Sequence, residues 1–458
     1  MINSIVSKKS LGLSGEIKIP GDKSISHRAL IIGSSVNGII KIYNILESDD
    51  VLATANALKK LGIIINKISS SEWEIKGNGI GTLEGNNPFL DMGNSGTGVR
   101  LLMGLVAGSD VEVTFSGDYS LNNRPMARVI EPLLKTGAII KHNNNTLPIK
   151  IRGSKIPLPI SYNSPVSSAQ VKSAILLAGM SSLGKTKFTE PSESRDHSER
   201  MLKYLGAEIN TNRLKDGSCE IILNGMPFLK PLDITVPSDP SSAAFPIVAA
   251  LITPNSEILI KNICVNELRI GLLYTLIEMG AKINISNKRE INGEIIADII
   301  AKSSILNAIT VPKSRAPSMI DEYPILAIAA SQAKGTTIME GVEELRYKET
   351  DRISAIVEGL CVLGIEANET KDSISITGIS ENASIQGGIE LDSRLDHRIA
   401  MSFLCLGLVT KRPIILNNTE TINSSFPSFF GQMNQIGANL EYITTTNNSS
   451  NDWNSNWW

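Results

Sequence analysis

Two cations and two hydroxyl groups fall within one short stretch, which reads Pro20-Gly21-Asp22-Lys23-Ser24-Ile25-Ser26-His27-Arg28. The residues before it alternate apolar and polar side chains as a strand does, and an apolar run of helical type follows it. Ser24 or Ser26 would therefore cap a helix, whose unpaired amide groups attract anions, and Lys23 and Arg28 add full charges beside them. The glycine spacing excludes a G-x-x-x-x-G-K-[ST] phosphate loop. The stretch predicts an anion-binding helix start, although a solvated, capped turn would have the same local sequence.

The composition indicates a soluble, globular protein of two or three domains. The chain has 458 residues, of which 42% are hydrophobic and 20% charged. A net charge of −2 provides no overall basic field, so we expect no nucleic-acid partner and no binding to an anionic membrane. The four cysteines lie far apart without a C-x-x-C pair, and the sequence has neither a signal-type apolar segment nor a membrane-length apolar run. We therefore expect a cytoplasmic, monomeric protein in which locally gathered cations hold any anionic ligand.

A helix-end pattern recurs six times along the chain. Each copy reads Leu-x-x-x-Gly, or Met-x-x-x-Gly in the last, and a β-like segment follows it. The six glycines are Gly62, Gly137, Gly206, Gly280, Gly364 and Gly437. Their spacing of 69 to 84 residues is too long for a solenoid repeat and fits a small α/β unit in each copy. A glycine at this position ends a helix in the left-handed conformation, which other residues adopt only at a steric cost.

Each repeat also contains a strand, a short polar turn and an apolar helix rich in small residues. We expect the six helices to open at Ser24, Gly96, Ser168, Ser241, Asp321 and Asp396. Pro324 and Pro246 fit the first turn of the fifth and fourth helices, where a missing N–H is no loss. Apolar residues surround these helices on nearly all sides, so the helices should lie buried under sheets. The six polar turns should then meet at one cleft, where helix N-termini attract anions.

Two turns mark the expected crossings between domains. Residues 236–242, which read Val-Pro-Ser-Asp-Pro-Ser-Ser, echo residues 19–24 but lack their cation. We therefore expect one three-unit domain at residues 21–239 and a second at residues 1–20 together with 240–443. Residues 444–458 are rich in Thr, Asn and Ser and end in two tryptophans, a composition that predicts a disordered tail.

Eight short motifs contain most of the unusual polar residues. They are Pro20-Gly21-Asp22-Lys23-Ser24, Gly93-Asn94-Ser95-Gly96-Thr97-Gly98, Asn123-Arg124-Pro125-Met126, Ser168-Ala169-Gln170-Val171-Lys172-Ser173, Arg195-Asp196-His197, Asp321-Glu322-Tyr323-Pro324, Lys348-Glu349-Thr350-Asp351-Arg352 and Asp396-His397-Arg398. In this order they resemble the family of 5-enolpyruvylshikimate-3-phosphate synthases (EPSP synthases); one motif would be weak evidence, but eight in order are specific. Gly-Asp-Lys-Ser and Ser-Ala-Gln resemble its divergent second class, which is associated with glyphosate tolerance. The resemblance implies an α/β fold, the two-domain inside-out α/β barrel built from six repeated small α/β units, three per domain.

The resemblance also implies an enolpyruvyl transferase of the shikimate pathway, which leads to chorismate and the aromatic amino acids. The enolpyruvyl group of phosphoenolpyruvate would pass to the 5-hydroxyl of shikimate 3-phosphate, with release of phosphate. The residues implied to contact shikimate 3-phosphate are Lys23, Ser24, Arg28, Ser168, Ala169 through its backbone, Gln170, Arg195, Asp321 and Lys348. Those implied for phosphoenolpyruvate are Lys23, Gly96, Arg124, Gln170, Arg352 and Arg398. Arg352 and Arg398 would hold its carboxylate, and Lys23 and Arg124 its phosphate, as suits cations that bind anionic groups.

The resemblance and the chemistry of the reaction point to Asp321, Glu349 and Lys23 as catalytic residues. Adding an alcohol to an enol ether needs a base for the hydroxyl and an acid for the methylene carbon, so we expect two carboxylates whose pKa values are pushed apart. Asp321 would be the base and Glu349 the acid, with Lys23 sharing proton transfer. Taken singly, Asp321 would be an ordinary helix cap and Glu349 part of a solvated charge run. The scheme needs no metal and no cofactor, and the histidines beside the motifs lack metal-ligand spacing, so we interpret them as structural. They are His27, His197 and His397.

Gly96 and Ser424 distinguish the chain within the family that it resembles. Tolerant members of the divergent class commonly carry alanine where Gly96 stands, so glyphosate should inhibit this chain more strongly than its class suggests. Ser424 stands where the better-known class has a lysine that contacts phosphoenolpyruvate. Either another cation, such as Lys348 or Arg195, supplies the missing charge, or the site is less positive.

Two alternatives stay open from the sequence. The sister enzyme that transfers enolpyruvyl to UDP-N-acetylglucosamine is built on the same repeat, but its mark is a cysteine on a mobile loop, and no cysteine falls in the six polar turns here. A non-catalytic, anion-binding relative would keep the arginines and lose the carboxylates, whereas both Asp321 and Glu349 are present. The sequence therefore favours the EPSP synthase reaction.

Overall fold

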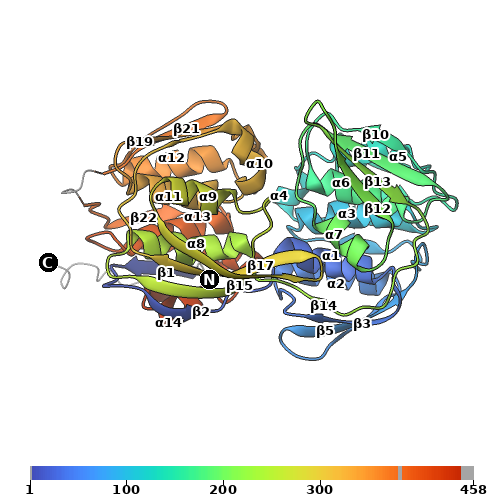
Figure 1. Cartoon of the computed structure of the whole chain (residues 1–458), viewed down its shortest axis with the longest axis horizontal. Coiled ribbons are helices and arrows are strands. Elements are labelled where there is room, and N and C mark those ends of the chain that lie inside the picture. Colours follow the sequence, from blue (N-terminus) through green and yellow to red (C-terminus); the bar gives the residue numbers. More distant parts are fainter. Residues whose placement is uncertain (1–2, 380–383, 445–458) are drawn as a thin grey trace, which may run out of the picture.

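The computed structural model describes residues 3–379 and 384–444, which fold into two lobes that lie side by side (Figure 1). The described strands form six four-stranded sheets. All six sheets share one plan: an edge strand runs parallel to its neighbour, and the other two pairings are antiparallel. The predicted six-unit α/β fold is therefore confirmed, as six open sheets rather than one continuous strand ladder.

Three sheets belong to each lobe. The sheets of the first lobe are β14 (Ile234–Thr235), β3 (Asn37–Tyr43), β5 (Glu72–Asn78) and β4 (Ile64–Lys67); β6 (Phe89–Asp91), β7 (Glu112–Ser116), β9 (Thr146–Arg152) and β8 (Ile139–Asn143); and β10 (Ser161–Asn163), β11 (Lys185–Glu190), β13 (Cys219–Asn224) and β12 (Ile209–Arg213). Those of the second lobe are β2 (Ser14–Ile17), β15 (Glu257–Cys264), β17 (Glu294–Lys302) and β16 (Lys282–Ile291); β18 (Thr310–Val311), β19 (Thr336–Glu340), β21 (Ser373–Thr377) and β20 (Glu366–Glu369); and β22 (Ile389–Asp392), β23 (Ile414–Asn417), β1 (Asn3–Lys8) and β24 (Asn439–Thr444).

Each unit contributes two main helices. The first helices are α1 (Lys23–Gly33), α3 (Gly96–Ala107), α6 (Ala169–Gly179), α8 (Pro240–Ile252), α11 (Tyr323–Ser331) and α13 (His397–Gly407). The second helices are α2 (Asp49–Lys60), α5 (Ala127–Leu134), α7 (His197–Tyr204), α9 (Gly271–Glu278), α12 (Arg352–Val362) and α14 (Phe429–Gln435). Short helices connect them: α4 (Tyr119–Asn122), α10 (Ala316–Met319), η1 (Lys313–Arg315), η2 (Glu343–Tyr347) and η3 (Thr419–Ser424).

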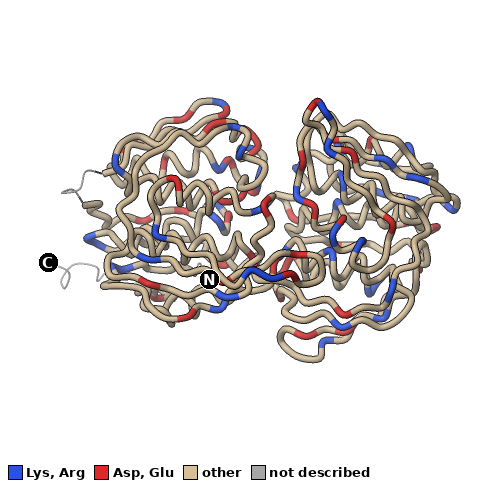
Figure 2. The backbone as a smooth tube through the Cα atoms, viewed as in Figure 1, with Lys and Arg blue, Asp and Glu red and all other residues tan. Residues whose placement is uncertain are grey.

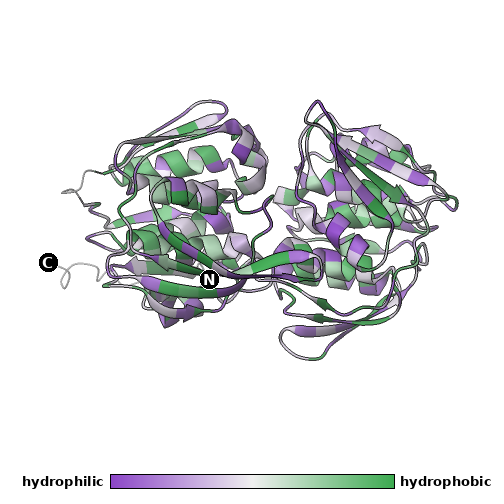
Figure 3. Ribbon diagram, in the orientation of Figure 1, coloured by the Kyte–Doolittle hydropathy of each residue, from purple (hydrophilic) through white to green (hydrophobic). Residues whose placement is uncertain are grey.

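The first helices lie buried inside the lobes. Every residue of α11 is buried, and α3 approaches α6 so closely that a Cβ on Gly104 would lie 2.2 Å from the carbonyl oxygen of Ala174. The buried apolar residues form two clusters, one centred in each lobe, and Figure 3 shows hydrophobic residues along the helices inside the lobes. Helices that are apolar on nearly all sides are stable only in such an environment. The prediction that they lie beneath sheets is therefore confirmed.

The six helix-end glycines adopt the left-handed conformation that the repeat predicts. Their φ angles range from +79° at Gly364 to +106° at Gly437. In α12, Ile353, Ile356 and Leu360 are buried at helical spacing, as expected for the amphipathic helix that precedes such a glycine.

The predicted cap of α1 is wrong. Neither Ser24 nor Ser26 caps the helix; Asp22 does, because its carboxylate accepts the N–H of Ile25 at 2.8 Å. Ser26 instead accepts the N–H of Leu46 at 3.0 Å. An ionised acceptor makes a stronger bond to a helix N-terminus than a hydroxyl does, which explains why the cap lies two residues before Ser24.

The position predicted for Pro246 is also wrong. The helix α8 begins at Pro240, which takes the first-turn position, and Pro246 lies inside the helix. Nearly all of α8 is buried, so tertiary packing outweighs the local cost of an interior proline. Pro324 does occupy the first turn of α11, as predicted.

The chain crosses between the two lobes twice, after β2 and after β14. β2 leads into α1 of the first lobe but pairs with β15 of the second, whereas β14 leads into α8 of the second lobe but pairs with β3 of the first. The crossings run side by side: the N–H of Asp22 donates to the carbonyl of Pro237 at 2.8 Å, and that of Asp239 to the carbonyl of Pro20 at 2.9 Å. We propose that the lobes are two domains divided after Pro20 and after Asp239.

The first and last described strands lie in one sheet, because β1 pairs with β24. The predicted tail, residues 444–458, lies outside the described residues except for Thr444, which ends β24. In the described part of the chain, no helix combines the length and the apolar character needed to cross a membrane.

Candidate active site

A cleft of about 410 Å³ lies between the lobes. Figure 2 shows basic and acidic residues on both sides of the division. Each of the six first helices contributes a residue at or beside its start: Lys23, Gly96, Ala169, Ser241, Asp321 and His397. The prediction that the six polar turns meet at one cleft is therefore confirmed.

Every residue that the sequence predicts to bind substrate or transfer protons lines this cleft. The first lobe contributes Lys23, Ser24, Arg28, Gly96, Arg124, Ser168, Ala169, Gln170 and Arg195, which belong to what we call the first wall. The second lobe contributes Asp321, Lys348, Glu349, Arg352 and Arg398, which belong to the second wall. Residues near opposite ends of the chain, such as Lys23 and Arg398, thus share one cavity.

Arg28 illustrates how the first wall holds its cations. Its side chain is buried, and its guanidinium group donates to Ser198 Oγ at 2.7 Å, to Ser173 Oγ at 2.8 Å and to the carbonyl oxygen of Ser24 at 2.9 Å. Burial lowers the pKa of Arg28 to about 10, which leaves it charged at neutral pH. Because its hydrogen-bond partners are uncharged, its positive charge remains available to an anion in the cleft.

Two other cations of the first wall face the same cavity. Arg124 donates to Asn94 Oδ1 at 2.6 Å, again a neutral partner. Lys23 differs, because its ammonium lies 3.0 Å from the carboxylate of Asp50. Burial raises the pKa of Asp50, an effect that Lys23 opposes. Lys23 is thus a cation of the first wall that has a carboxylate as its partner.

Asp321 spans the cleft from the second wall. Its carboxylate, 20% exposed, lies 2.9 Å from Arg195 Nη2 of the first wall, 3.6 Å from Lys348 Nζ and 3.7 Å from Arg352 Nη1. Burial raises the pKa of Asp321, but Lys348, Arg195, Arg398 and Arg352 together hold it well below its usual range. Asp321 is not the cap of α11, which begins after Glu322. The carboxylate is therefore ionised and lies among cations from both walls.

Glu349 lies beside the fully buried Arg352. Arg352 Nη2 donates to Glu349 Oε2 at 2.6 Å, while its Nε donates to Asp396 at 2.7 Å. Burial raises the pKa of Glu349, but Arg352 and then Arg124 hold it well below its usual range. The expectation that the pKa values of Asp321 and Glu349 are pushed apart is therefore wrong for this structure. Both are low because cations surround both carboxylates.

A buried charge cluster joins the two walls at the chain crossings. Arg269 Nη2 lies 3.2 Å from both Asp22 Oδ2 and Asp239 Oδ1, and its Nη1 lies 3.8 Å from Glu322. Burial raises the pKa of Asp22, but Arg269, His197, the N–H of Ile25 and Arg195 together outweigh burial and lower the pKa to about 2. Burial and the charge of Asp22 raise the pKa of Asp239 to about 6. The cluster links the start of α1 to the start of α8.

Sequence reasoning missed several charged residues of the cleft. They are Asp50, Arg100, Arg128, Asp239, Arg269, Lys313 and Glu344. Arg100 and Arg128 stand four residues after Gly96 and Arg124, so helical spacing could have found them. None of the other five residues belongs to the eight motifs. Only the fold brings them to the cavity.

Ser424 lies away from the cleft lining. Its hydroxyl donates to the carbonyl oxygen of Thr421 at 2.8 Å within η3. Lys348 and Arg195, the cations suggested as substitutes for a lysine there, both line the cleft, as does the unpredicted Lys313. The cavity therefore gathers many cations although this position carries none.

The three histidines beside the motifs differ in their surroundings. His27 is buried against Thr54, its Nδ1 2.9 Å from the hydroxyl oxygen, and burial lowers its pKa to about 3. His197 lines the cleft and its Nδ1 lies 2.7 Å from Glu294, whereas His397 lines the cleft and has its pKa lowered well below the usual range by burial and by Lys23. Among residues 3–379 and 384–444, no group of His, Cys, Asp and Glu could hold a metal ion.

The two-lobed fold of the chain is the fold of an enolpyruvyl transferase of known structure. The structure matches that of the enolpyruvyl transferase NikO from Streptomyces tendae with a TM-score of 0.77 over 97% of this chain and 99% of that chain. The sequences are only 14% identical, so this likeness concerns the fold alone.

The sequence comparisons identify the family. The model of the EPSP synthase (3-phosphoshikimate 1-carboxyvinyltransferase) family matches residues 8–433. The 3-phosphoshikimate 1-carboxyvinyltransferases of Chelativorans sp. (strain BNC1) and Bartonella quintana (strain Toulouse) are 49% and 48% identical to the chain over 437 residues, which is 95% of this chain and 97% and 98% of theirs. The structure of EPSP synthase from Acinetobacter baumannii superimposes with a TM-score of 0.85 at 39% identity, over 96% of this chain and 100% of that chain. The chain belongs to the EPSP synthase family.

Proposed function

We propose that the chain transfers the enolpyruvyl group of phosphoenolpyruvate to the 5-hydroxyl of shikimate 3-phosphate and releases phosphate, as a 3-phosphoshikimate 1-carboxyvinyltransferase of the shikimate pathway. Membership of the EPSP synthase family over nearly the whole chain supports the reaction. The observation that carries the proposal is that all the predicted site residues line a single cleft between the lobes. We further propose that the protein is a cytoplasmic monomer; its four cysteines are unpaired, as expected in a reducing compartment.

Shikimate 3-phosphate would bind mainly to the first wall. Arg28 presents a guanidinium group on neutral partners, and the start of α6 adds backbone amides beside Arg195. The full set proposed for this substrate is Lys23, Ser24, Arg28, Ser168, Ala169, Gln170, Arg195, Asp321 and Lys348. Its 5-hydroxyl would then face Asp321, which lies directly opposite Arg195.

Phosphoenolpyruvate would bridge the two walls. Arg352 and Arg398 of the second wall would hold its carboxylate, and Lys23 and Arg124 of the first would hold its phosphate. Gly96 and Gln170 complete the proposed set. Glyphosate, which carries a carboxylate and a phosphonate, would compete for these same cations.

Proton transfer is proposed for Asp321, Glu349 and Lys23. Asp321 takes the proton of the 5-hydroxyl while the hydroxyl oxygen bonds to C2 of phosphoenolpyruvate. Glu349 delivers a proton to C3. The adduct then loses phosphate from C2 and a proton from C3, which restores the double bond. Glu349 must be protonated for the first step, and anionic substrates beside Arg352 and Arg124 would raise its pKa by opposing those cations. Lys23, paired with Asp50, would share the proton transfer.

The experiment that tests the proposal is a phosphate-release assay with phosphoenolpyruvate and two alternative acceptors. We expect release with shikimate 3-phosphate and none with UDP-N-acetylglucosamine. The described lining of the cleft includes no cysteine, which favours this outcome over the sister reaction. Release only with UDP-N-acetylglucosamine would support the sister enzyme, and release with neither acceptor would support a non-catalytic relative.

A further inference from the structure

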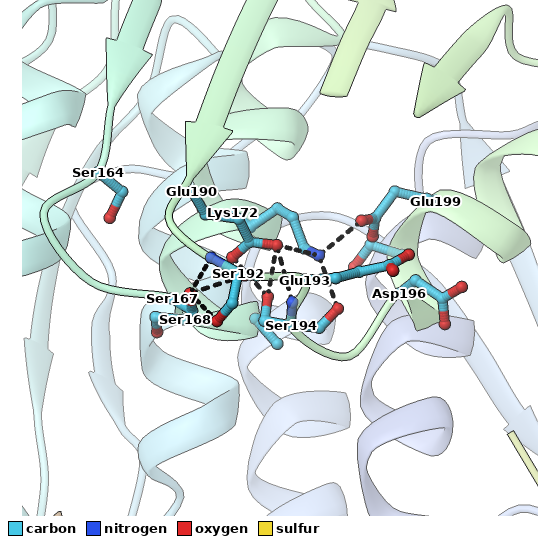
Figure 4. A network of polar contacts seen from close by, with 12 residues as sticks. Ser164, Ser167, Ser168, Lys172, Glu190, Ser192, Glu193, Ser194, Asp196 and Glu199 are labelled. Carbon is cyan, nitrogen blue, oxygen red and sulfur yellow. Dashed lines mark hydrogen bonds and ion pairs between the residues drawn. The ribbon is translucent and has the colours of Figure 1, made fainter. Parts of the chain in front are cut away.

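Lys172 is a buried charge that the proposed reaction does not use. It lies in the first turns of α6, is 1% exposed, and is absent from the residues that line the cleft. Its Nζ lies 3.0 Å from Glu190 Oε1, 2.7 Å from Glu199 Oε1 and 3.0 Å from the carbonyl oxygen of Ser194 (Figure 4). Three segments, the end of β11, the loop after it and α7, therefore meet at one ammonium group.

The loop between β11 and α7 is fixed through Ser194. The carbonyl of Ser194 accepts from Lys172, its N–H donates to Glu190 Oε1 at 2.9 Å, and its hydroxyl donates to Glu190 Oε2 at 2.7 Å. Arg195 is the next residue and reaches the cleft. Lys172 and Glu190 thus anchor the backbone of the residue directly before Arg195.

The start of α6 lies one helical turn from Lys172. The N–H of Lys172 donates to the carbonyl oxygen of Ser168 at 3.0 Å, and the amide of Gln170 donates to Thr97 Oγ1 at 3.0 Å. Ser168 and Gln170 line the cleft together with Arg195. Lys172 therefore sits beneath the helix start and ties it to the loop that supplies the guanidinium group.

The charges explain why an ammonium group occupies this position. Burial raises the pKa of Glu199, and Lys172 is the main charge that opposes this effect. Burial also lowers the pKa of Lys172, but Glu199 and Glu190 outweigh it and raise the pKa above its usual value. Two buried carboxylates would be strongly unfavourable without a cation between them, so a hydroxyl or an amide could not replace Lys172.

We propose that Lys172 is a positioning residue that fixes Arg195 relative to the start of α6 and thereby sets the affinity of the first wall for its anionic substrate. The proposal rests on the proposed function in taking that substrate to be shikimate 3-phosphate. Groups behind a binding residue act by holding it in the productive geometry, and their loss commonly weakens a site by roughly 10- to 100-fold.

The first test is Lys172→Met, which keeps the length of the side chain and removes its charge. We expect the KM for shikimate 3-phosphate to rise about 10- to 100-fold. The KM for phosphoenolpyruvate should rise much less, because Gln170 is the one residue of its proposed set that lies at the start of α6. Lys187→Met is the matched control, since Lys187 of β11 is a half-exposed lysine that pairs with Glu220 outside the cleft. Equal rises in both Michaelis constants would indicate general destabilisation and overturn the proposal.

The second test separates an effect through Arg195 from an independent one. In an Arg195→Ala background, Lys172→Met should change the KM for shikimate 3-phosphate by less than about threefold, because the group that it positions is gone. Full additivity of the two substitutions would overturn the proposal.

If Lys172→Met does not fold, Glu190→Gln serves instead. It keeps the Lys172–Glu199 pair, and we expect a smaller rise in the KM for shikimate 3-phosphate. An unchanged constant in Glu190→Gln would equally overturn the proposal. Failure of the proposed function is distinguishable, because the wild-type protein would then release no phosphate.

Discussion

The two walls of the cleft are both rich in cations but hold them differently. On the first wall, serine hydroxyls, an asparagine and carbonyl oxygens position Arg28 and Arg124. On the second wall, carboxylates position Arg352, Arg269 and Lys348. A cation on neutral partners keeps its charge for a ligand, whereas a cation among carboxylates mainly sets their pKa values. Lys23 and Arg195 are the exceptions on the first wall, because they face the carboxylates of Asp50 and Asp321. We therefore propose that Arg28 and Arg124 act mainly in binding, and that the carboxylates of the second wall act mainly in proton transfer.

The largest effect should follow from removing the base of the second wall. Asp321→Asn keeps the shape of the side chain and removes its ability to take a proton, so kcat should fall by about 10²- to 10⁴-fold. Binding of shikimate 3-phosphate, measured by calorimetry, should persist because Arg28 and Arg195 are untouched. Glu366→Gln, at an exposed position of β20, is the control. A near-normal kcat would remove Asp321 from the role of base.

The next effect should come from the first wall and appear in binding. Arg195→Ala removes a charge-assisted contact, which typically costs about 2–5 kcal/mol, or roughly 30- to 4,000-fold in the KM for shikimate 3-phosphate. The KM for phosphoenolpyruvate should change much less. Arg213→Ala is the matched control, because Arg213 is 76% exposed and pairs with Glu193 at the surface of the same lobe. A loss confined to kcat would contradict the division between binding and proton-transfer walls.

A smaller effect is expected where the walls join. Because the folded protein raises the pKa of Asp239 from 3.8 to about 6, this group makes folding less favourable as pH rises from about 4 to 6, and the effect is complete above that range. The change in the free energy of unfolding caused by Asp239→Asn should therefore be more favourable at pH 7.5 than at pH 4.5, by about 1–3 kcal/mol. Urea unfolding at both pH values measures this difference.

Asp22→Asn is the control for that measurement. The pKa of Asp22 is lowered from 3.8 to about 2, so its stabilising contribution is present above pH 4 and is lost only as pH falls toward 2. Between pH 4.5 and 7.5, the effect of Asp22→Asn should depend on pH less than that of Asp239→Asn, because its only source there is the influence of the Asp22 charge on Asp239. Parallel pH profiles for the two variants would show that the asymmetry between the two carboxylates is absent.

The smallest effect concerns Gly96 on the first wall. A methyl group there would lie 2.9 Å from Arg100 Nη1 and 3.0 Å from Arg124 Nη1, which are the ends of flexible side chains. We expect Gly96→Ala to cost glyphosate binding about 1 kcal/mol, roughly fivefold, with a smaller rise in the KM for phosphoenolpyruvate. Inhibition kinetics on both forms measure the two constants. A joint rise would mean that the methyl group acts by displacing Arg124, and the selective steric effect would be disproved.

Local rules predicted those parts of the fold that depend on neighbouring residues. The left-handed φ of Gly364 and Gly437 follows from the helix-end pattern, because glycine adopts that conformation without steric cost. Features that depend on distant residues escaped prediction. Burial makes the interior Pro246 tolerable, and the neighbours that set the pKa of Glu349 come from both lobes. The buried partners of Lys172 were likewise invisible in its own motif.

The second lobe contains both β1 and β24, and this has a consequence for synthesis on the ribosome. All strands of the first lobe have been made once β14 is complete, so that lobe can finish folding while later segments are still being added. β1 must wait for β23 and β24, which follow it by about 400 residues. At 5–20 residues per second this interval is roughly 20 to 80 s, during which β1 is an unpaired strand that could pair wrongly. Its polar and charged residues, Ser4, Ser7 and Lys8 among them, would lessen that danger while the second lobe remains incomplete.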